Sequence, residues 1–202
     1  MTSEPLVLAF DTSAAHCAAA LLCGDRVLCA RHEDMARGQA ERLMPLLQEV
    51  LTEAGRDWSD LDAIGVGTGP GNFTGIRISV SAARGLALGL DVPAVGVSLF
   101  ETTTTLANRT QIAVPAPRGQ FYLCDTDKDA APVLTADLPD LPVALSTQHS
   151  ATEHVTTMAR IAAARHTGEV DRPAPLYIRP ADAAPSRDKP PVILDAPPTG
   201  AP

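Results

Sequence analysis

The stretch of sequence that decides the fold is Asp62–Leu90, which reads DAIGVGTGPGNFTGIRISVSAARGLALGL. Its apolar run Ala63–Val66 is short and is followed by turn residues, which favours a buried strand over a helix. Residues 69–71 are Gly-Pro-Gly and predict a tight loop, because glycine lets the backbone approach a neighbour closely. A helix is expected to begin near Thr74, where Asn72 or Thr74 can cap its first N–H groups.

The loop Gly69–Gly71 leaves two interpretations open. A glycine loop in front of a helix can hold an anion on its free N–H groups, or it can serve only to pack a strand against the helix. The dinucleotide pattern G-x-G-x-x-G fails in every frame, and the lysine of a P-loop is absent. A phosphate site at this loop would therefore belong to neither of these two motifs.

Composition excludes several classes of function. The chain has 202 residues, enough for one large domain or two small ones, and 45% of them are hydrophobic. Its net charge of −8 gives no general attraction to nucleic acid or anionic membranes, and 3% aromatic residues make a base-stacking platform improbable. The N-terminus resembles neither a signal peptide nor a membrane span. The four cysteines include no C-x-x-C pair, which favours free thiols in a cytoplasmic protein over disulfides or zinc.

The hydrophobic pattern along the first half of the chain predicts alternating strands and helices. We expect strands at residues 5–11, 17–23 and 26–32, a helix at 39–54, a strand at 63–66, a helix at 75–90, a strand at 93–97 and a helix at 99–108. Short links make the first three strands antiparallel, whereas helical crossovers make the later ones parallel. This order predicts an α/β fold with a mixed sheet flanked by helices, the ribonuclease-H-like core of the actin-like ATPase superfamily, in an N-terminal lobe of residues 1–108.

Residues 109–179 are expected to form a reduced C-terminal lobe. The pattern predicts strands at 111–114 and 120–124, a loop-like segment at 128–142, a helix at 152–166 and a short strand at 176–178. Beyond Arg179 the composition shifts to proline and alanine, so residues 180–202 are expected to be a disordered tail.

The expected helix Gly75–Leu90 is apolar on two sides, and its only strongly polar residues are Arg77 and Arg84. Gly85 and Gly89 each lower helix propensity by about 1 kcal/mol relative to alanine. Small residues four apart can let a second backbone come close. One side should therefore pack on the sheet, and the other should meet either another chain or this protein's own C-terminal half.

The plausible acidic site is Asp11-Thr12-Ser13, at the end of the first strand. Together with Gly69 and Gly71 it forms the candidate nucleotide-binding set, although Asp11 can equally be a turn residue that bonds its own backbone. No two histidines lie three or four residues apart, so no helix presents a two-histidine metal site. The sequence supplies no convincing catalytic or metal-binding set, which disfavours an enzyme that works alone.

Four segments together resemble the TsaB (YeaZ) family, bacterial proteins of threonylcarbamoyladenosine synthesis on tRNA. They are LAFDTSAAHCAAALL, GQAERLMPLLQEVLTEAG, LDAIGVGTGPGNFTGIRISVSAARGLALGL and VPAVGVSLFE. The signature G-P-G-[SN]-F-T-G-[ILV]-R, here Gly69–Arg77, is specific when it follows a strand and a D-T-S start. The resemblance is dense over Leu6–Glu101 and fainter in PRGQFYL and APLYIRP.

The resemblance implies a two-lobed actin-like protein without catalysis of its own. Such a protein pairs with the transferase TsaD, or with itself as a homodimer when TsaD is absent, and the ATPase TsaE joins them. The complex modifies the adenosine beside the anticodon of ANN-decoding tRNAs, which this chain would contact only indirectly. ATP or ADP with Mg²⁺ would be expected only at the complex interface. The histidine pair that binds metal in TsaD has no counterpart in GQAERLMPLL. The implied partner interface lies on the first two helices and comprises Leu43, Leu47, Val50, Ile78, Ser81, Ala82, Gly85 and Gly89.

The alternative interpretation is a nucleotide-binding ATPase or kinase that acts alone through Asp11 and the Gly69–Gly71 loop. A peptidase, a label attached to the wider family, is disfavoured because metal ligands and a nucleophile are missing. The sequence departs from the family in two places. Relatives often carry a histidine where this chain has Gly38-Gln39-Ala40, and residues 128–150 are compressed and rich in proline, which puts the contact with TsaE in question.

Overall fold

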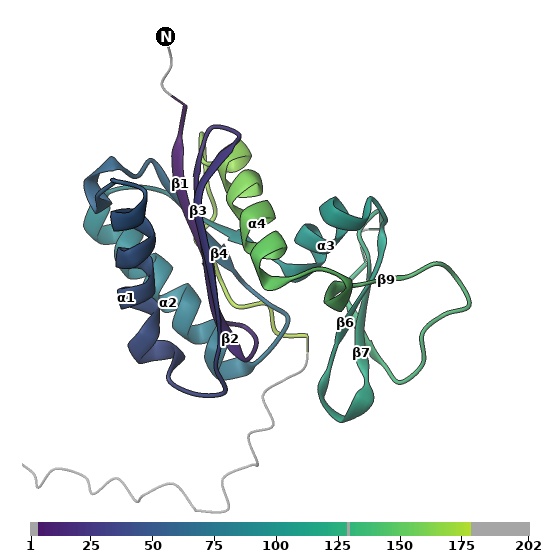
Figure 1. The fold of residues 1–202 in the computed structure, drawn as a ribbon. Helices are drawn as coiled ribbons and strands as arrows, with labels where there is room; N and C mark the ends of the chain where they lie inside the picture. Colours follow the sequence, from purple (N-terminus) through teal and green to yellow (C-terminus); the bar gives the residue numbers. More distant parts are fainter. Residues whose placement is uncertain (1–3, 129, 179–202) are drawn as a thin grey trace, which may run out of the picture.

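The computed structural model describes residues 4–128 and 130–178, which form two sheets and four α-helices (Figure 1). The first sheet contains β1 (Leu6–Asp11), β2 (His16–Cys23), β3 (Arg26–Asp34), β4 (Ala63–Gly67) and β5 (Ala94–Val97). The helices are α1 (Gln39–Glu53), α2 (Phe73–Leu90), α3 (Leu99–Ala107) and α4 (Ala151–Arg165). Short 3-10 turns are η1 (Trp58–Asp60), η2 (Pro117–Gly119) and η3 (Ser146–Gln148).

The first sheet has the strand order β3-β2-β1-β4-β5. Strands β1, β2 and β3 pair antiparallel, because each link between them is too short for a crossover. Strand β4 pairs in parallel with β1 and with β5, and α2 forms the crossover between β4 and β5. The predicted order of three antiparallel strands followed by helix–strand units is confirmed, and with it the ribonuclease-H-like α/β fold.

Two cores lie on opposite faces of this sheet. Successive side chains of β1 alternate between them, as the two-residue period of a strand requires: Leu8 and Phe10 contact the core under α1 and α2, and Val7 and Ala9 contact the core under α4. Figure 1 shows α1 and α2 on one side of the sheet and α4 on the other. The structure therefore places α4 with the first sheet, although the sequence grouped it with the lobe of residues 109–179.

The smaller second sheet completes the reduced lobe. Its strands, in the order β8-β7-β6-β9, are β6 (Gln111–Pro115), β7 (Phe121–Asp125), β8 (Val133–Thr135) and β9 (Ala144–Leu145). Its core consists of Phe100, Ile112, Val114, Tyr122 and Ala144.

Two predictions for the second half need correction. The loop expected at residues 128–142 contains strand β8, because Val133 and Leu134 pair with the free edge of β7. The strand expected at 176–178 is irregular backbone, although Leu176 N does donate a hydrogen bond to Thr68 O (2.8 Å). The tail expected at 180–202 lies outside the described residues.

The cysteines carry free thiols, as predicted. Burial raises the pKa of the Cys17 thiol to about 11, so this sulfur is protonated and a poor nucleophile at neutral pH. Among the described helices, none is long and apolar enough to cross a membrane.

His154 of α4 fastens the second lobe to the first. Its Nδ1 lies 2.8 Å from the Thr102 hydroxyl of α3, and its Nε2 lies 2.9 Å from the Ser146 carbonyl oxygen of η3. A carbonyl oxygen only accepts, so Nε2 carries the proton and Nδ1 accepts from the hydroxyl. Burial lowers the pKa of His154, because desolvation disfavours the charged ring.

This histidine makes stability depend on pH. The unfolded state gains a proton on His154 as the pH falls below about 6.5, whereas the folded state resists protonation until a lower pH. The contribution of His154 to the free energy of unfolding should therefore be fully present above pH 7. The free energy of unfolding, measured with urea, should decline as the pH is lowered toward 5.5. His154→Ala should cost about 1–3 kcal/mol at pH 7.5, because two buried partners lose their hydrogen bonds, and should flatten this decline.

His166→Ala, at the C-terminal end of the same helix, is the matched control and should keep the slope of the original protein. If His154→Ala retained the full decline between pH 7.5 and 5.5, the titration would belong to another group.

Candidate functional site

The turn after β1 and the loop after β4 lie against each other, because these strands are parallel neighbours. The Thr12 hydroxyl donates to Gly75 O (2.7 Å), and Asn72 N donates to Ser13 O (2.6 Å). A Cβ added at Gly71 would lie 2.3 Å from Ser13 O, and one added at Gly75 would lie 1.9 Å from Thr12 O. Both positions therefore require glycine for a direct contact between two backbones.

Two N–H groups around the start of α2, those of Asn72 and Gly75, have partners within the chain. Of the two predicted candidates, Asn72 and Thr74, the N-cap is Asn72, whose side-chain oxygen accepts from Gly75 N (3.0 Å). The N–H of Asn72 is taken by Ser13 O. These contacts favour the interpretation in which the loop packs strand against helix, and nucleotide binding by Gly69 and Gly71 stays a prediction without support from them.

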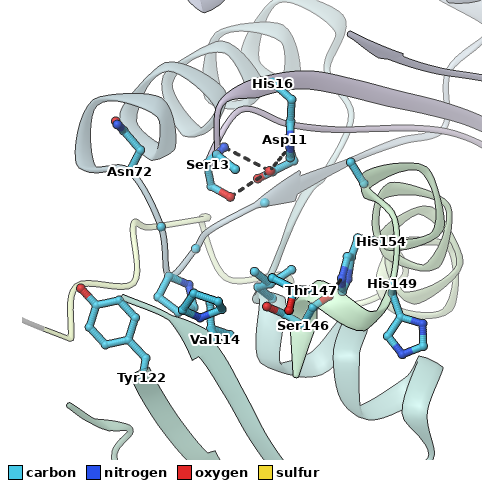
Figure 2. Close-up of a pocket in the computed structure, with 18 of the residues that line it drawn as sticks. Asp11, Ser13, His16, Asn72, Val114, Tyr122, Ser146, Thr147, His149 and His154 are labelled. Carbon is cyan, nitrogen blue, oxygen red and sulfur yellow. Dashed lines mark hydrogen bonds and ion pairs between the residues drawn. The ribbon is translucent and has the colours of Figure 1, made fainter. Parts of the chain in front are cut away.

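Asp11 bonds its own turn. Its Oδ2 accepts from Ser13 N (3.1 Å), from the Ser13 hydroxyl (2.8 Å) and from His16 Nε2 (3.0 Å) (Figure 2). The carboxylate is 14% exposed, and its Oδ1 fills the space that a Cβ at Gly67 would need. In the part of the chain that the structure describes, no three His, Cys, Asp or Glu side chains are grouped to hold a metal ion.

A cavity of about 600 Å³ lies beside Asp11, between the glycine loop and the second sheet (Figure 2). Residues from β1, β6, β7, η3 and α4 line it. Four of the five histidines of the chain are among them, namely His16, His32, His149 and His154. Asp11 is the only carboxylate, and no lysine or arginine occurs among the described residues of this lining. The described lining therefore lacks the cationic side chains that usually hold the phosphates of a nucleoside triphosphate.

The second candidate site is the outer face of α2. The helix buries Ile76, Val80 and Ala83 on the sheet, whereas Leu88 on the other side is 82% exposed. Ser81, Gly85 and Gly89 are also exposed, and a Cβ added at either glycine would meet nothing within 4 Å. Ile78 and Ala82 are half-buried at the margin of this face. The C-terminal half of the chain, where described, does not cover Gly85 and Gly89, because α4 packs on the opposite side of the sheet.

Three predicted interface residues on α1 are core residues instead. Leu43, Leu47 and Val50 are at most 1% exposed and face the first sheet. The apolar stripe of α1 is buried in the core, so these side chains are not accessible to a partner. The exposed large apolar residue of α1 is Met44, on the opposite side.

Sequence reasoning missed a cluster at the first turn of α2. The Arg77 guanidinium lies 3.8 Å from the Phe73 ring centroid, and its Nε donates to the Tyr177 hydroxyl (2.8 Å). The two aromatic rings lie 5.1 Å apart and both are exposed. Phe73 and Arg77 are four residues apart on a helix, so their contact was predictable, but Tyr177 lies 100 residues further along the chain.

The two kinds of glycine in α2 predict opposite effects of the same substitution. Gly75→Ala should destabilise the protein by about 1–3 kcal/mol or more, because the new methyl group meets the rigid Thr12 carbonyl. Gly85→Ala, the matched control, should be neutral or stabilise by up to about 1 kcal/mol, because the position is open and alanine favours helix. Thermal and urea unfolding measure both, and equal effects at the two positions would contradict the backbone contact.

The chain is similar to proteins that are named for tRNA modification. The family model "TsaD: tRNA N6-adenosine threonylcarbamoyltransferase" matches residues 32–131. The tRNA threonylcarbamoyladenosine biosynthesis protein TsaB of Escherichia coli is 36% identical over 129 residues, which cover 61% of this chain and 55% of that protein. An uncharacterized protein of Mycobacterium tuberculosis is 34% identical over 167 residues, covering 74% of this chain and 79% of that protein. The chain spans about half the length of the curated TsaB relatives that it matches.

Among solved structures, YeaZ from Pseudomonas aeruginosa superposes with a TM-score of 0.67 and 27% identity. The match covers 86% of this chain and 99% of that one. It extends over both sheets, whereas the motifs quoted above are concentrated in the first. Taken with the D-T-S turn and the G-P-G-N-F-T-G-I-R loop that it contacts, these matches show that the chain belongs to the TsaB (YeaZ) family.

Proposed function

We propose that the chain is a non-catalytic subunit that binds and activates a TsaD transferase as threonylcarbamoyladenosine is formed in tRNA. Relatives from Escherichia coli and Bacillus subtilis are named for this biosynthesis. The family model of the transferase itself matches residues 32–131, so the expected partner resembles this chain in the region that contains α1 and α2. Two related folds can pair through equivalent helices.

The observation that carries the proposal is the open outer face of α2. Gly85 and Gly89 together weaken the helix by roughly 2 kcal/mol relative to alanine, and no described part of the chain contacts them. Their small size is useful where a second backbone must come close. Leu88, the most exposed large apolar residue described, lies on the same helix and favours a partner over solvent.

The Arg77 cluster is the natural anchor at one end of this face. Arginine and tyrosine dominate the binding energy of many protein interfaces. Arg77 is already held by Phe73 and Tyr177, so a partner would bind a side chain that has little rotamer freedom left to lose.

In this proposal the chain contributes binding and no chemistry, since Asp11 is engaged by its own turn. TsaD would supply the transferase site in the cytoplasm, and TsaE would complete the assembly. The substrate is the adenosine beside the anticodon of ANN-decoding tRNAs, which this acidic chain would contact only indirectly. Without TsaD, the same face would join two copies of this chain.

The proposal predicts the effect of filling the open face. Gly85→Leu should leave the free chain folded, because a Cβ at this exposed position meets nothing within 4 Å, but should separate the two backbones at the interface. Overpacking of about 1–3 kcal/mol corresponds to a roughly 5- to 150-fold weaker complex with TsaD. Calorimetric titration measures the affinity, and mass spectrometry of tRNA nucleosides measures the modification.

Ala164→Leu, at an exposed position of α4 on the other side of the sheet, is the matched control and should behave like the original chain. Full affinity and full modification with Gly85→Leu would overturn the assignment of the interface.

ATP hydrolysis separates this proposal from an ATPase that acts alone. The purified chain should release no phosphate from Mg-ATP above background, and Asp11→Asn should change nothing. Turnover that disappeared in Asp11→Asn would instead favour the enzyme.

A further inference from the structure

We propose that the cavity beside Asp11 binds a small, largely apolar ligand that carries a hydrogen-bond donor and no phosphate or other anionic group. Its volume of about 600 Å³ lies within the range of roughly 300–1,000 Å³ that is typical of small-molecule sites. The proposed partner function does not use this space, because Ser81, Gly85, Leu88 and Gly89 are not part of its lining.

The walls of the cavity are mainly apolar and come from both lobes. Figure 2 shows Asp11 and His16 on one side, with Val114 and Tyr122 across the cavity from them. Leu99 and Met158 close it from α3 and α4. Apolar walls with a few fixed polar groups are the usual composition of a site for a small organic molecule.

Polar groups with unused hydrogen-bonding capacity face this space. Oδ1 of Asp11 accepts no hydrogen bond from any described residue, although Oδ2 accepts three. Tyr122 also lines the cavity and as a whole is 9% exposed. The Thr147 side chain is exposed at the same cavity. An N–H or O–H group on the ligand could donate a hydrogen bond to Oδ1 of Asp11.

Two features select against an anion. No cationic Lys or Arg side chain occurs in the described lining. The Asp11 carboxylate places a negative charge at the wall. The lining histidines do not reverse this charge. Each of His16, His32 and His149 lies beside a carboxylate that balances a protonated ring, namely Asp11, Asp34 and Glu153, and burial lowers the pKa of His154.

A pair of fluorescent probes tests the charge selection directly. N-phenyl-1-naphthylamine is neutral with one N–H donor, and 8-anilinonaphthalene-1-sulfonate has the same ring systems with an added sulfonate. The full chain should bind the neutral probe at one saturable site, at least tenfold more tightly than the sulfonate. Millimolar Mg-ATP should not displace it. No saturable binding of the neutral probe, equal affinity for the two probes, or displacement by Mg-ATP would overturn the proposal.

Substitutions locate the site. Thr147→Trp and Ala14→Trp start from exposed positions on opposite walls, and each should weaken the neutral probe at least tenfold by filling the cavity. Ala164→Trp places the same side chain at an exposed position of α4 outside the cavity lining, and should leave probe binding unchanged. Asp11→Asn should reduce the ratio of the two affinities, so that the neutral probe is favoured over the sulfonate by less than in the original chain.

Unchanged binding in both cavity variants, or loss of binding with Ala164→Trp alone, would show that the probe lies elsewhere. Circular dichroism confirms that each variant is folded before it is titrated. Because TsaD binding is tested with Gly85→Leu and a different measurement, either proposal can fail without the other.

Discussion

The structure depends on a direct contact between two stretches of backbone, the Thr12–Ser13 turn and the start of α2. Hydrogen bonds cross it in both directions, and no side chain fits at Gly71 or Gly75. The contact fixes where α2 begins and how it is rotated about its axis on the sheet. That rotation decides which residues are buried beneath the helix and which remain on its outer face. The same contact forms one wall of the cavity beside Asp11.

This contact also gives the glycine loop a role in packing. Loops in front of a helix bind anions through N–H groups that are free. Here two of these groups already have acceptors, because Asn72 N donates to Ser13 O and Gly75 N donates to the Asn72 side chain. The glycines at 71 and 75 are therefore explained by packing within the chain. Gly85 and Gly89 have no such explanation, because both face open space. The glycines of α2 thus differ in the physical reason for their presence: Gly75 is required by packing within the chain, and Gly85 and Gly89 are not.

Much of the fold could be predicted from sequence because its patterns are local: strand alternation, helical periodicity, the Asn72 cap and the order of elements. The failures concern where a correctly predicted element packs. The pattern of α4 predicts a buried stripe, but nothing local says that Val155 and Met158 lie under the first sheet. The apolar stripe of α1 is likewise compatible with a core or with a partner interface, and in the structure it packs in the core. Contacts between distant residues, such as Arg77 with Tyr177 and the walls of the cavity, leave no local signal at all.

The area needed for a stable complex limits how far α2 can act alone. A helix of 18 residues is roughly 27 Å long and about 10 Å wide, so one face offers roughly 270 Å². Specific interfaces usually bury about 800 Å² on each partner. The remaining area must come from neighbouring surface, and α1 lies beside α2 on the same side of the sheet (Figure 1). Two exposed residues extend this apolar surface. Met44 lies on α1, and Tyr177 packs against Phe73 at the first turn of α2. The proposed interface would therefore include the exposed side of α1 rather than Leu43, Leu47 and Val50, the three α1 residues that the resemblance implied.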